Sequence, residues 1–508
     1  MSADLLDELV HQFTDPFAFY RELIQNSLDS GSTRIEVLLQ YAPNKKRGLA
    51  TATVADWGEG MGRKIIDDYL LTRFRSSKEN DLTKIGKFGI GFVSVFACAP
   101  DAVVVDTGRD GESWRVLFKK DKSYELLRLD APVEGTRVTV HKRLSPDAYD
   151  DFVKQSEAAV RRWCRHAEAD IAFAAGNADG TAPSEPVAVN EPFAVDAPYQ
   201  VELEEEGTVI VAGISRVRPA PSGFYNRGLT LLETTEPLVP NVAIKIASRW
   251  LEHTLTRDNV RRDENFQKAV GQARKLAKKS LVAQLPGEMR RCAMDPKLGA
   301  DWQVLFTYAL ELRGVEPLWL RNPGGGSTAL KPLKAIYFAT EPSALTTRLI
   351  AAGVPVVEAT GSEAFVELLR LRLQVLPAED HWVHAEPAPV ARAPAFAAAL
   401  QAALKASGSR IDQVVVTRLF GANPTPFAMI EQLGMPEAQA KANASPFGAQ
   451  SAKRVLAVDF GHEELKAIVP LFETAPRLAA LLVARRLAVM NAALDPARDW
   501  ALTQWGLT

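Results

Sequence analysis

Cysteine and histidine are both scarce in this chain of 508 residues. The 3 cysteines, Cys98, Cys164 and Cys292, show no paired spacing, which excludes a disulfide framework and indicates a reducing environment. The 7 histidines are scattered, so they predict no metal site built on histidine and cysteine.

Neither sign of charge is in excess, because 60 Lys and Arg face 62 Asp and Glu, for a formal net charge of -2. This balance gives no overall bias toward nucleic acid or anionic membranes. No signal peptide opens the chain, and no apolar run approaches the ~20 residues that cross a membrane. With 47% hydrophobic and 24% charged residues, we expect a globular cytoplasmic protein without a membrane partner.

Two common phosphate-binding motifs are also missing. No glycine-rich loop ends in Gly-Lys-Ser/Thr, and no strand precedes a Rossmann glycine pattern. Instead, Gly86, Gly89 and Gly91 stand just before an apolar run that is typical of a helix. Free backbone N–H groups at such a helix start favour phosphate binding.

Three polar residues share one face of a helix predicted over residues 21–31. Glu22, Asn26 and Asp29 follow the spacing i, i+4, i+7, while the other faces are apolar. A carboxylate and an amide beside a core are costly unless they hold a metal ion, a water or a ligand. A solvated helix face is the other interpretation of this stripe taken alone.

The ends of this helix are marked by the sequence. Asp15 followed by Pro16 predicts an N-cap with proline at the first helical position, and Gly31 predicts the stop. Strands are expected next, over 34–39 and 49–55, from their alternating and β-branched residues.

The second strand runs into Asp56, which is followed by glycines at every second position, Gly58, Gly60 and Gly62. Such a loop allows a ligand to approach the backbone closely. The Asp56 carboxylate is a pure acceptor, suited to an exocyclic amine such as that of adenine. Further along, Thr136 opens a strand and places a hydroxyl at the edge of the same sheet.

These four segments, in this order, resemble the nucleotide-binding domain shared by gyrase, the heat shock protein 90 chaperones, histidine kinases and mismatch-repair MutL proteins. The resemblance implies a Bergerat (GHKL) fold, in which helices cover one face of a mixed sheet and ATP lies between the helices and a lid. It implies that Glu22 is the general base and that Asn26 binds Mg²⁺. It further implies ATP binding by Asn26, Asp29, Asp56, Gly58, Gly60, Met61, Ser76, Ser77, Lys78, Gly86, Lys87, Phe88, Gly89, Ile90, Gly91, Phe92 and Thr136.

The phosphate loop distinguishes between branches of the family. The sequence from Gly86 to Phe92 is similar to the chaperone pattern, whereas the mismatch-repair proteins have Arg-Gly-Glu there. The lid segment, roughly 67–85, is shorter than in typical chaperones of this family and is similar to that of the Microrchidia (MORC) ATPases. A histidine kinase is disfavoured, because no helix with a phosphoacceptor histidine precedes the glutamate helix.

A second segment resembles the chaperone middle domain. Aligning on Leu255-Thr256-Arg257 implies that Arg257 is the catalytic-loop arginine, and Arg261 stands where the family has a second polar contact. An arginine that reaches the γ-phosphate would offset charge developing in the transition state. The alternative is an ordinary basic surface, because acidic residues lie among these arginines.

Three domains of α+β class follow from this resemblance. They are a Bergerat ATP-binding α/β sandwich with its lid over 1–185, a two-part α/β middle domain over 186–385, and a mixed α/β or helical dimerisation domain over 386–508. The middle domain is expected to contain, in order, strands over 186–262, helices over 263–315, a strand over 335–339, a helix over 342–352 and a strand over 355–358.

The C-terminal part is expected to begin with a Pro/Ala linker over 386–394. A helix near 474–492 is apolar over most of its circumference, so it must be buried in its own domain or against a second copy. The resemblance favours dimerisation, with the stripe formed by Leu478, Leu481, Leu482 and Leu487.

We therefore interpret the sequence as that of an ATP-dependent, homodimeric chaperone-like protein, similar to HtpG. The resemblance implies ATP and Mg²⁺ as substrate and cofactor, a slow ATPase, a clamp cycle and a role in the stress response. It implies unfolded client proteins as partners. A MORC- or MutL-like ATPase clamp on DNA is the alternative, with basic segments such as 274–279 and 290–291 as phosphate contacts. A nucleotide-binding scaffold without turnover is the third interpretation.

Overall fold

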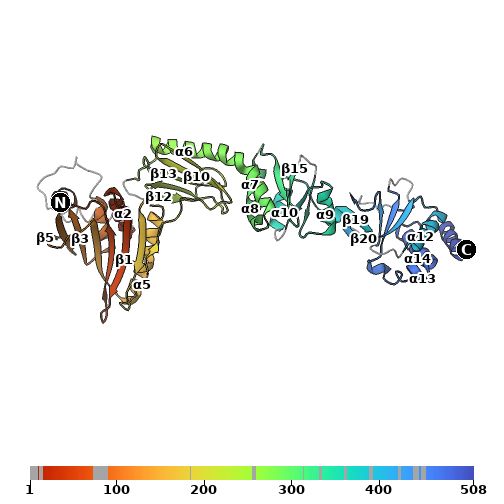
Figure 1. The fold of residues 1–508 in the computed structure, drawn as a ribbon, viewed down its shortest axis with the longest axis horizontal. Helices are drawn as coiled ribbons and strands as arrows, with labels where there is room; N and C mark the ends of the chain where they lie inside the picture. The colour runs from red at the N-terminus through yellow and green to blue at the C-terminus, as the bar shows by residue number, and fades with distance from the viewer. Residues whose placement is uncertain are drawn as a thin grey trace. The chain divides into compact units, whose positions relative to one another are not determined.

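The computed structural model describes residue 10 and residues 15–71, 90–183, 185–254, 259–312, 314–330, 335–359, 363–387, 393–421, 425–438, 445–447 and 453–508. The chain is divided into two compact units, 1–281 and 282–508, which are taken in turn (Figure 1). Within the described ranges, no helix is long and apolar enough to cross a membrane. Helices and sheets occur together in both units, which confirms the α+β class.

The first unit contains an eight-stranded mixed sheet with the order β5-β4-β3-β6-β2-β1-β7-β8. Its neighbouring strands are antiparallel, except that β1 and β7 run parallel. The bounds are β1 Arg34–Ala42, β2 Gly48–Asp56, β3 Ala102–Arg109, β4 Glu112–Lys119, β5 Tyr124–Leu129, β6 Thr136–Leu144, β7 Asp170–Ala175 and β8 Val187–Ala188. The strands predicted over 34–39, over 49–55 and after Gly135 are therefore confirmed.

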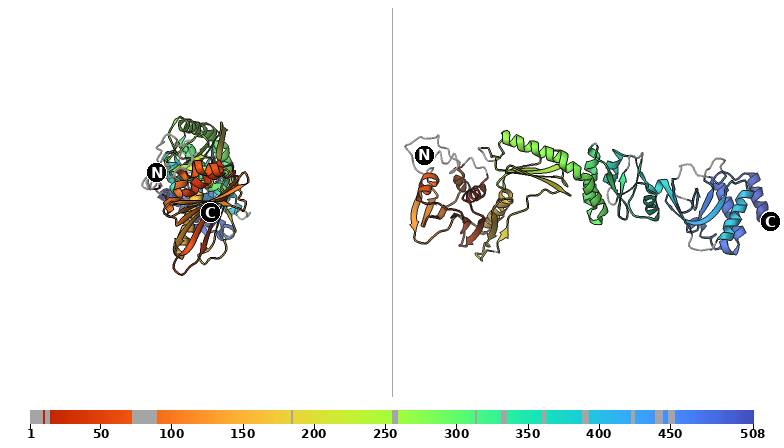
Figure 2. Two further views of the ribbon diagram at one scale, coloured as in Figure 1. Left: turned by 90° about the vertical axis from the view of Figure 1, so that its left-hand side faces the viewer. Right: turned by 45° about the horizontal axis from the view of Figure 1, so that its top comes forward.

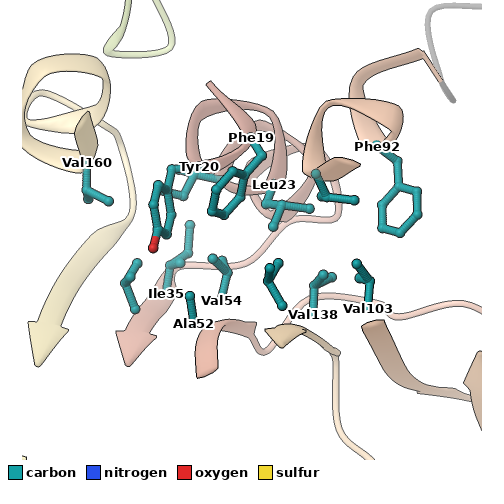
Figure 3. Close-up of a cluster of buried hydrophobic side chains, with 14 of the residues drawn as sticks. Phe19, Tyr20, Leu23, Ile35, Ala52, Val54, Phe92, Val103, Val138 and Val160 are labelled. Carbon is teal, nitrogen blue, oxygen red and sulfur yellow. The ribbon is translucent and has the colours of Figure 1, made fainter. Parts of the chain in front are cut away.

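Helices cover one face of this sheet, and the main core lies beneath them. They are α2 (Phe19–Asp29), the short α4 (Ile90–Val93), the helical turn η2 (Ser94–Cys98) and α5 (Pro146–Cys164). Figure 3 shows Phe19, Tyr20 and Leu23 of α2 above the sheet residues Val54 and Val138, all of them buried. Because side chains alternate along a strand, the valines of β2 and β6 line one face together.

The C-terminal end of α2 is as predicted, but its start is not. Gly31 adopts φ +78°, and the N–H groups of Gly31 and Ser32 donate to the carbonyls of Leu28 and Ser27, which closes the helix. The helix begins at Phe19 rather than at Pro16. Asp15 instead accepts a hydrogen bond from the N–H of Phe17 and holds a separate turn before the helix.

A second sheet of the first unit has the order β12-β11-β13-β10-β9. Its strands are β9 Gln200–Glu205, β10 Thr208–Ile214, β11 Ser222–Asn226, β12 Leu229–Thr234 and β13 Val242–Ser248. Helix α6 (Glu264–Leu276) runs along this sheet, and Asp263 caps its first turn (Figure 2). The strand-rich character predicted over 186–262 and the helix that follows are confirmed.

The second unit opens with helices α7 (Val282–Met294) and α8 (Gly299–Glu311) and the hairpin β14 (Leu318–Arg321) and β15 (Ser327–Leu330). A parallel three-stranded sheet follows, in the order β17-β16-β18, formed by β16 Ile336–Ala339, β17 Val356–Glu358 and β18 Val375–Pro377. Helices α9 (Ala344–Ala351) and α10 (Glu363–Arg370) connect its strands. The predicted α/β unit is therefore confirmed.

The last part of the chain forms a sheet of order β21-β23-β20-β19-β22. Its strands are β19 Trp382–Pro387, β20 Gln413–Gly421, β21 Phe427–Ile430, β22 Pro436–Ala438 and β23 Val455–Asp459. Its helices are α11 Ala378–His381, α12 Pro394–Ala406, α13 Leu471–Thr474, α14 Pro476–Met490 and α15 Pro496–Leu507. The Pro/Ala linker was wrong at its start, since Glu386 and Pro387 belong to β19, where backbone pairing with β20 outweighs the local composition.

Candidate nucleotide site

Three neighbouring strands of the large sheet place polar side chains at one level. Asp56 at the end of β2 is paired with Thr136 at the start of β6, and Thr136 is in turn paired with Thr107 of β3. Directly paired residues project to the same face of a sheet. Because this is the face that α2 covers, the three residues form a polar row at the edge of an otherwise apolar core.

Asp56 is held from three sides. Its Oδ2 accepts from the Ser27 hydroxyl at 2.8 Å, and its Oδ1 accepts from the backbone N–H groups of Gly58 at 3.0 Å and Thr136 at 3.3 Å. Only 7% of Asp56 is exposed. Burial raises the pKa of Asp56, and the three donors act in the opposite direction. The carboxylate is therefore a fixed acceptor with a preset orientation.

The loop after Asp56 has no room for side chains at its glycines. A Cβ on Gly58 would lie 1.9 Å from Oγ of Ser30, the residue that follows α2. Gly60 has φ +66°, and a Cβ there would lie 2.0 Å from the carbonyl oxygen of Gly108. The next N–H, that of Met61, donates to Oγ1 of Thr107 at 2.8 Å. Close packing thus fixes this loop against both α2 and β3.

The predicted stripe on α2 is divided between two environments. Glu22 is buried, with 5% exposed, and its Oε1 lies 3.5 Å from Nη2 of Arg21. Asn26, one turn later, is exposed. Asp29 is also exposed and accepts from Nη1 of Arg227 at 2.9 Å. Of the three, Glu22 alone has its carboxylate enclosed by protein.

Comparison with known proteins identifies this part of the chain. Residues 18–138 match the family described as "Histidine kinase-, DNA gyrase B-, and HSP90-like ATPase". Residues 18–138 are therefore the part of the chain that is similar to an ATPase domain. They contain the whole polar row, the loop after Asp56 and the helix that carries Glu22.

Several proteins named "Chaperone protein HtpG" are similar to the chain. The protein from Methylococcus capsulatus is 29% identical over 194 residues, covering 32% of this chain and 30% of that protein. The protein from Rhodospirillum rubrum is 33% identical over 168 residues, covering 27% of each chain. That from Nitrobacter winogradskyi is 31% identical over 204 residues, covering 34% of this chain and 31% of that protein. The chain thus matches under a third of the length of these relatives, and the resemblance to the heat shock protein 90 family is confirmed.

Most of the residues predicted to contact the phosphates lie outside the described residues. Ser76, Ser77, Lys78, Gly86, Lys87, Phe88 and Gly89 fall in that group, as does Arg257. Ile90 and Gly91 begin the short helix α4, and Phe92 is buried in the core. The roles assigned to these residues stay predictions.

The segment around Arg261, within the first unit, is held by local contacts. Arg261 donates its backbone N–H to the carbonyl of Glu252 at 2.7 Å, and its side chain lies 3.5 Å from Glu252 and 3.9 Å from Asp263. Burial, and then the positive charge of Arg21, lower the pKa of His253. The Arg21 charge acts on His253 because this segment comes close to α2 of the ATPase domain.

Arg21 is the charged neighbour of the Glu22 carboxylate. Its guanidinium is buried and lies 5.1 Å from the centre of the Trp163 ring. Burial lowers the pKa of Arg21 to about 10. The Arg21 guanidinium thus places a buried positive charge next to the Glu22 carboxylate.

Sequence reasoning missed Ser27 and Thr107. Ser27 was hidden because a serine in an apolar helix is usually a core residue, although its position next to Asn26 was a signal. Thr107 follows Val103 and Val105 at every second position, so strand alternation placed a hydroxyl on the buried face. Its contact with Thr136 depends on the pairing of β3 with β6, which only the fold reveals.

Proposed function

We propose that this chain binds and hydrolyses ATP and acts as an ATP-dependent chaperone of the HtpG type. The observation that carries this proposal is the polar row of Asp56, Thr136 and Thr107. This row lies beneath α2, the helix to which the buried Glu22 belongs. The match of residues 18–138 to an ATPase family supports it. The named relatives are chaperones, which supports the choice of branch.

In this proposal the base of the nucleotide is held by Asp56. The Ser27 hydroxyl and the backbone N–H groups of Gly58 and Thr136 fix the carboxylate. It can therefore accept a hydrogen bond from a ligand without changing its orientation. An exocyclic amine such as that of adenine supplies the matching donor. Gly58, Gly60 and Met61 bring backbone close to the base, and the Thr136 hydroxyl contributes a second polar contact.

Glu22 is proposed to orient the attacking water. Its carboxylate is buried, and its Oε1 lies 3.5 Å from Nη2 of Arg21. A positioned carboxylate that accepts the water's proton is worth about 10²- to 10⁴-fold in rate. The phosphate contacts are assigned to Ser76, Ser77, Lys78, Gly86, Lys87, Phe88, Gly89, Ile90, Gly91 and Phe92, with Asp29 at the ribose or phosphate side.

The residues around Asn26 fit a Mg²⁺ ion that is held mainly by the nucleotide. Asn26 is exposed and lies one helical turn from Glu22. Mg²⁺ takes few protein ligands and keeps several waters when it bridges phosphates. Nowhere in the described parts of the chain do three or more His, Cys, Asp or Glu gather to hold a metal without a nucleotide. When bound, Mg²⁺ would neutralise charge on the phosphates.

Arg257 and Arg261 are proposed to complete the site from the second sheet's side. The flanking residues support this, because burial, and then the charge of Arg21 in α2, lower the pKa of His253. Hydrolysis would then depend on how the segment around His253 is held against α2. Arg261 would have to exchange its contacts with Glu252 and Asp263 for the nucleotide, so Arg257 is the stronger candidate.

A homodimer through residues 386–508 is part of the proposal. Helix α14 buries Ala480, Val483 and Leu487 in its own core, yet Leu478 and Leu482 are 50% and 42% exposed. We define the exposed C-terminal patch as Leu478, Leu482, Val489, Trp500 and Leu507 of α14 and α15. In this proposal, these exposed apolar side chains form the contact with the second copy. In the proposed clamp cycle, this contact would hold the two chains together permanently. The proposed domains are 1–185, 186–385 and 386–508.

One turnover assay tests the chaperone against its alternatives. ATP hydrolysis by the full chain would be measured alone, with double-stranded DNA and with an unfolded client protein. We expect hydrolysis that the client alters and DNA does not, together with suppressed client aggregation. Steep salt-dependent DNA binding that stimulates hydrolysis would favour the DNA clamp instead. ATP binding without phosphate release would favour the scaffold.

A further inference from the structure

We infer that Thr107 is a positioning residue that fixes the Thr136 hydroxyl as an acceptor toward the nucleotide base. The inference rests on the proposed function, since it concerns how the same site reads its base. Thr107 is completely buried, and no motif in the sequence draws attention to it.

The protons around Thr107 can be counted. Its Oγ1 receives the Met61 N–H at 2.8 Å, lies 3.1 Å from the carbonyl oxygen of Gly135, and lies 2.9 Å from Oγ1 of Thr136. A hydroxyl has one proton to donate and two lone pairs to accept with. The Met61 N–H can only donate, so it occupies one of the Thr107 lone pairs.

The carbonyl of Gly135 determines which group receives the Thr107 hydroxyl proton. A carbonyl oxygen can only accept, and two oxygens at 3.1 Å without a proton between them repel each other. Thr107 therefore donates its proton to Gly135. The 2.9 Å contact with Thr136 needs a proton as well, and Thr136 has to supply it.

Thr136 is left with acceptor capacity alone. Its single proton is committed to Thr107, so its two lone pairs can only receive hydrogen bonds. Thr136 is partly exposed, whereas Thr107 is enclosed, so Thr136 is the one that faces a ligand. Beside it stands the Asp56 carboxylate, whose Oδ1 receives the Thr136 backbone N–H.

The result is two acceptors on paired residues, the Asp56 carboxylate and the Thr136 hydroxyl, and the Thr136 backbone N–H between them is already committed to Asp56. An exocyclic amine carries two hydrogens and matches such a pair. A base with a carbonyl oxygen at the same position, as in guanine or hypoxanthine, would set acceptor against acceptor. Leaving such groups unmatched in a buried site is the strongest form of discrimination that hydrogen bonds provide.

Thr107 matters to this discrimination because it removes the rotational freedom of Thr136. In Thr107→Val, a side chain of similar shape without the hydroxyl, Thr136 would be free to turn its proton toward the ligand. The site could then donate to a carbonyl oxygen as well as accept from an amine. A purely structural role would instead weaken all nucleotides by the same factor.

The test compares the dissociation constants of ADP and inosine diphosphate for the full chain by isothermal titration calorimetry. We expect the preference for ADP to fall by about threefold to tenfold in Thr107→Val, the discrimination of one neutral hydrogen bond. Thr107→Ser, which keeps the hydroxyl, should restore the wild-type preference. In a Thr136→Val background, Thr107→Val should change the preference no further.

The failures of the inference and of the proposed function are separate. An unchanged ratio of the two constants in Thr107→Val, with both affinities lowered equally, would overturn the inference and leave ADP binding intact. A Thr107→Ser variant as unselective as Thr107→Val would overturn it too. A wild-type chain that binds neither nucleotide would overturn the proposed function together with the inference.

Discussion

Arg227 donates from Nη1 to Oδ1 of Asp29 at 2.9 Å and from Nη2 to the carbonyl of Leu28 at 3.0 Å. Arg227 lies in the tight turn between β11 and β12, with φ +48°, and Asp29 lies in the last turn of α2. A cation at the C-terminal end of a helix is also favoured by the helix dipole. The five-stranded sheet is thus bonded to the helix that carries Glu22.

Removing this contact should reduce turnover without removing nucleotide affinity. In Arg227→Ala, the second sheet would lose its bond to the end of α2, so the segment around His253 would be held less firmly near Arg21. Because Arg227 is partly exposed, we expect a loss in stability of about 1 kcal/mol or less. ATP hydrolysis and ADP affinity would be measured side by side. Arg216→Ala, which removes an exposed ion pair with Asp196, is the matched control, and equal effects in both variants would contradict the role of Arg227.

Asp56→Asn should separate binding from stability. Asparagine can still accept from the N–H groups of Gly58 and Thr136, but it lacks the charge that makes Asp56 a strong acceptor for an amine. We expect ADP binding to weaken by about 1.5–3 kcal/mol, the value of a hydrogen bond to a charged group. The unliganded protein should melt at the same temperature or higher, since burial disfavours the Asp56 charge. A variant that binds ADP as the wild type does would exclude Asp56 from the site.

The same carboxylate predicts a pH dependence of stability. The pKa of Asp56 is raised in the folded state, so its charge lowers the free energy of unfolding above that pKa. As pH falls through the raised pKa, Asp56 is protonated in the folded chain first, and the difference between wild type and Asp56→Asn should shrink. Thermal unfolding of both chains without nucleotide, from neutral pH down to the ordinary aspartate range, measures this difference. A difference that grows on acidification would contradict the direction of the shift.

The arginine assignments can be tested within one short segment. Arg257→Ala should keep nucleotide affinity and lose most of the turnover, because an arginine that reaches the γ-phosphate stabilises the transition state alone. Arg261→Ala should have a smaller effect, since Arg261 is already paired with Glu252 and Asp263. Arg262→Ala, a change to an exposed neighbour, is the control. Equal turnover in all three variants would indicate that the segment is an ordinary basic surface with no part in hydrolysis.

The exposed C-terminal patch predicts a dimer that point changes can dissolve. Leu478→Glu with Leu482→Glu should give a monomer by light scattering, because two charges would replace apolar surface at the proposed contact. A truncation near 386 is a poorer test, since it cuts through β19. Leu371→Glu, at an exposed leucine outside the patch, is the control and should leave the dimer intact. A wild-type chain that is monomeric without nucleotide would refute this interface.

Much of the fold was predictable because local patterns and tertiary pairing agree. Ile35 and Val37 alternate in β1, and Gly31 ends α2 through a backbone conformation that glycine favours. The start of α2 was missed because Asp15 bonds to Phe17 in a turn of its own. The order of the strands, which brings β3 next to β6, is not encoded in any short motif.

The site was predictable only as far as its motifs reach. Glu22 and Asp56 stand in recognisable sequences, but the Arg227 contact with Asp29 joins residues 198 positions apart. The Thr107 contact likewise depends on strand register. Asp29 belongs to the same motif as Glu22, but the motif does not reveal its ion pair with Arg227.

The most direct test of the central claim is the rate of phosphate release from saturating ATP by the full chain, beside Glu22→Gln. This change keeps the shape of a side chain that is buried next to Arg21, so the fold and the ATP affinity should be preserved. We predict measurable phosphate release by the wild type and a rate lower by about a hundredfold or more in Glu22→Gln, as loss of a general base requires. Equal rates in the two chains would contradict the assignment of Glu22 and, with it, the proposed mechanism of hydrolysis.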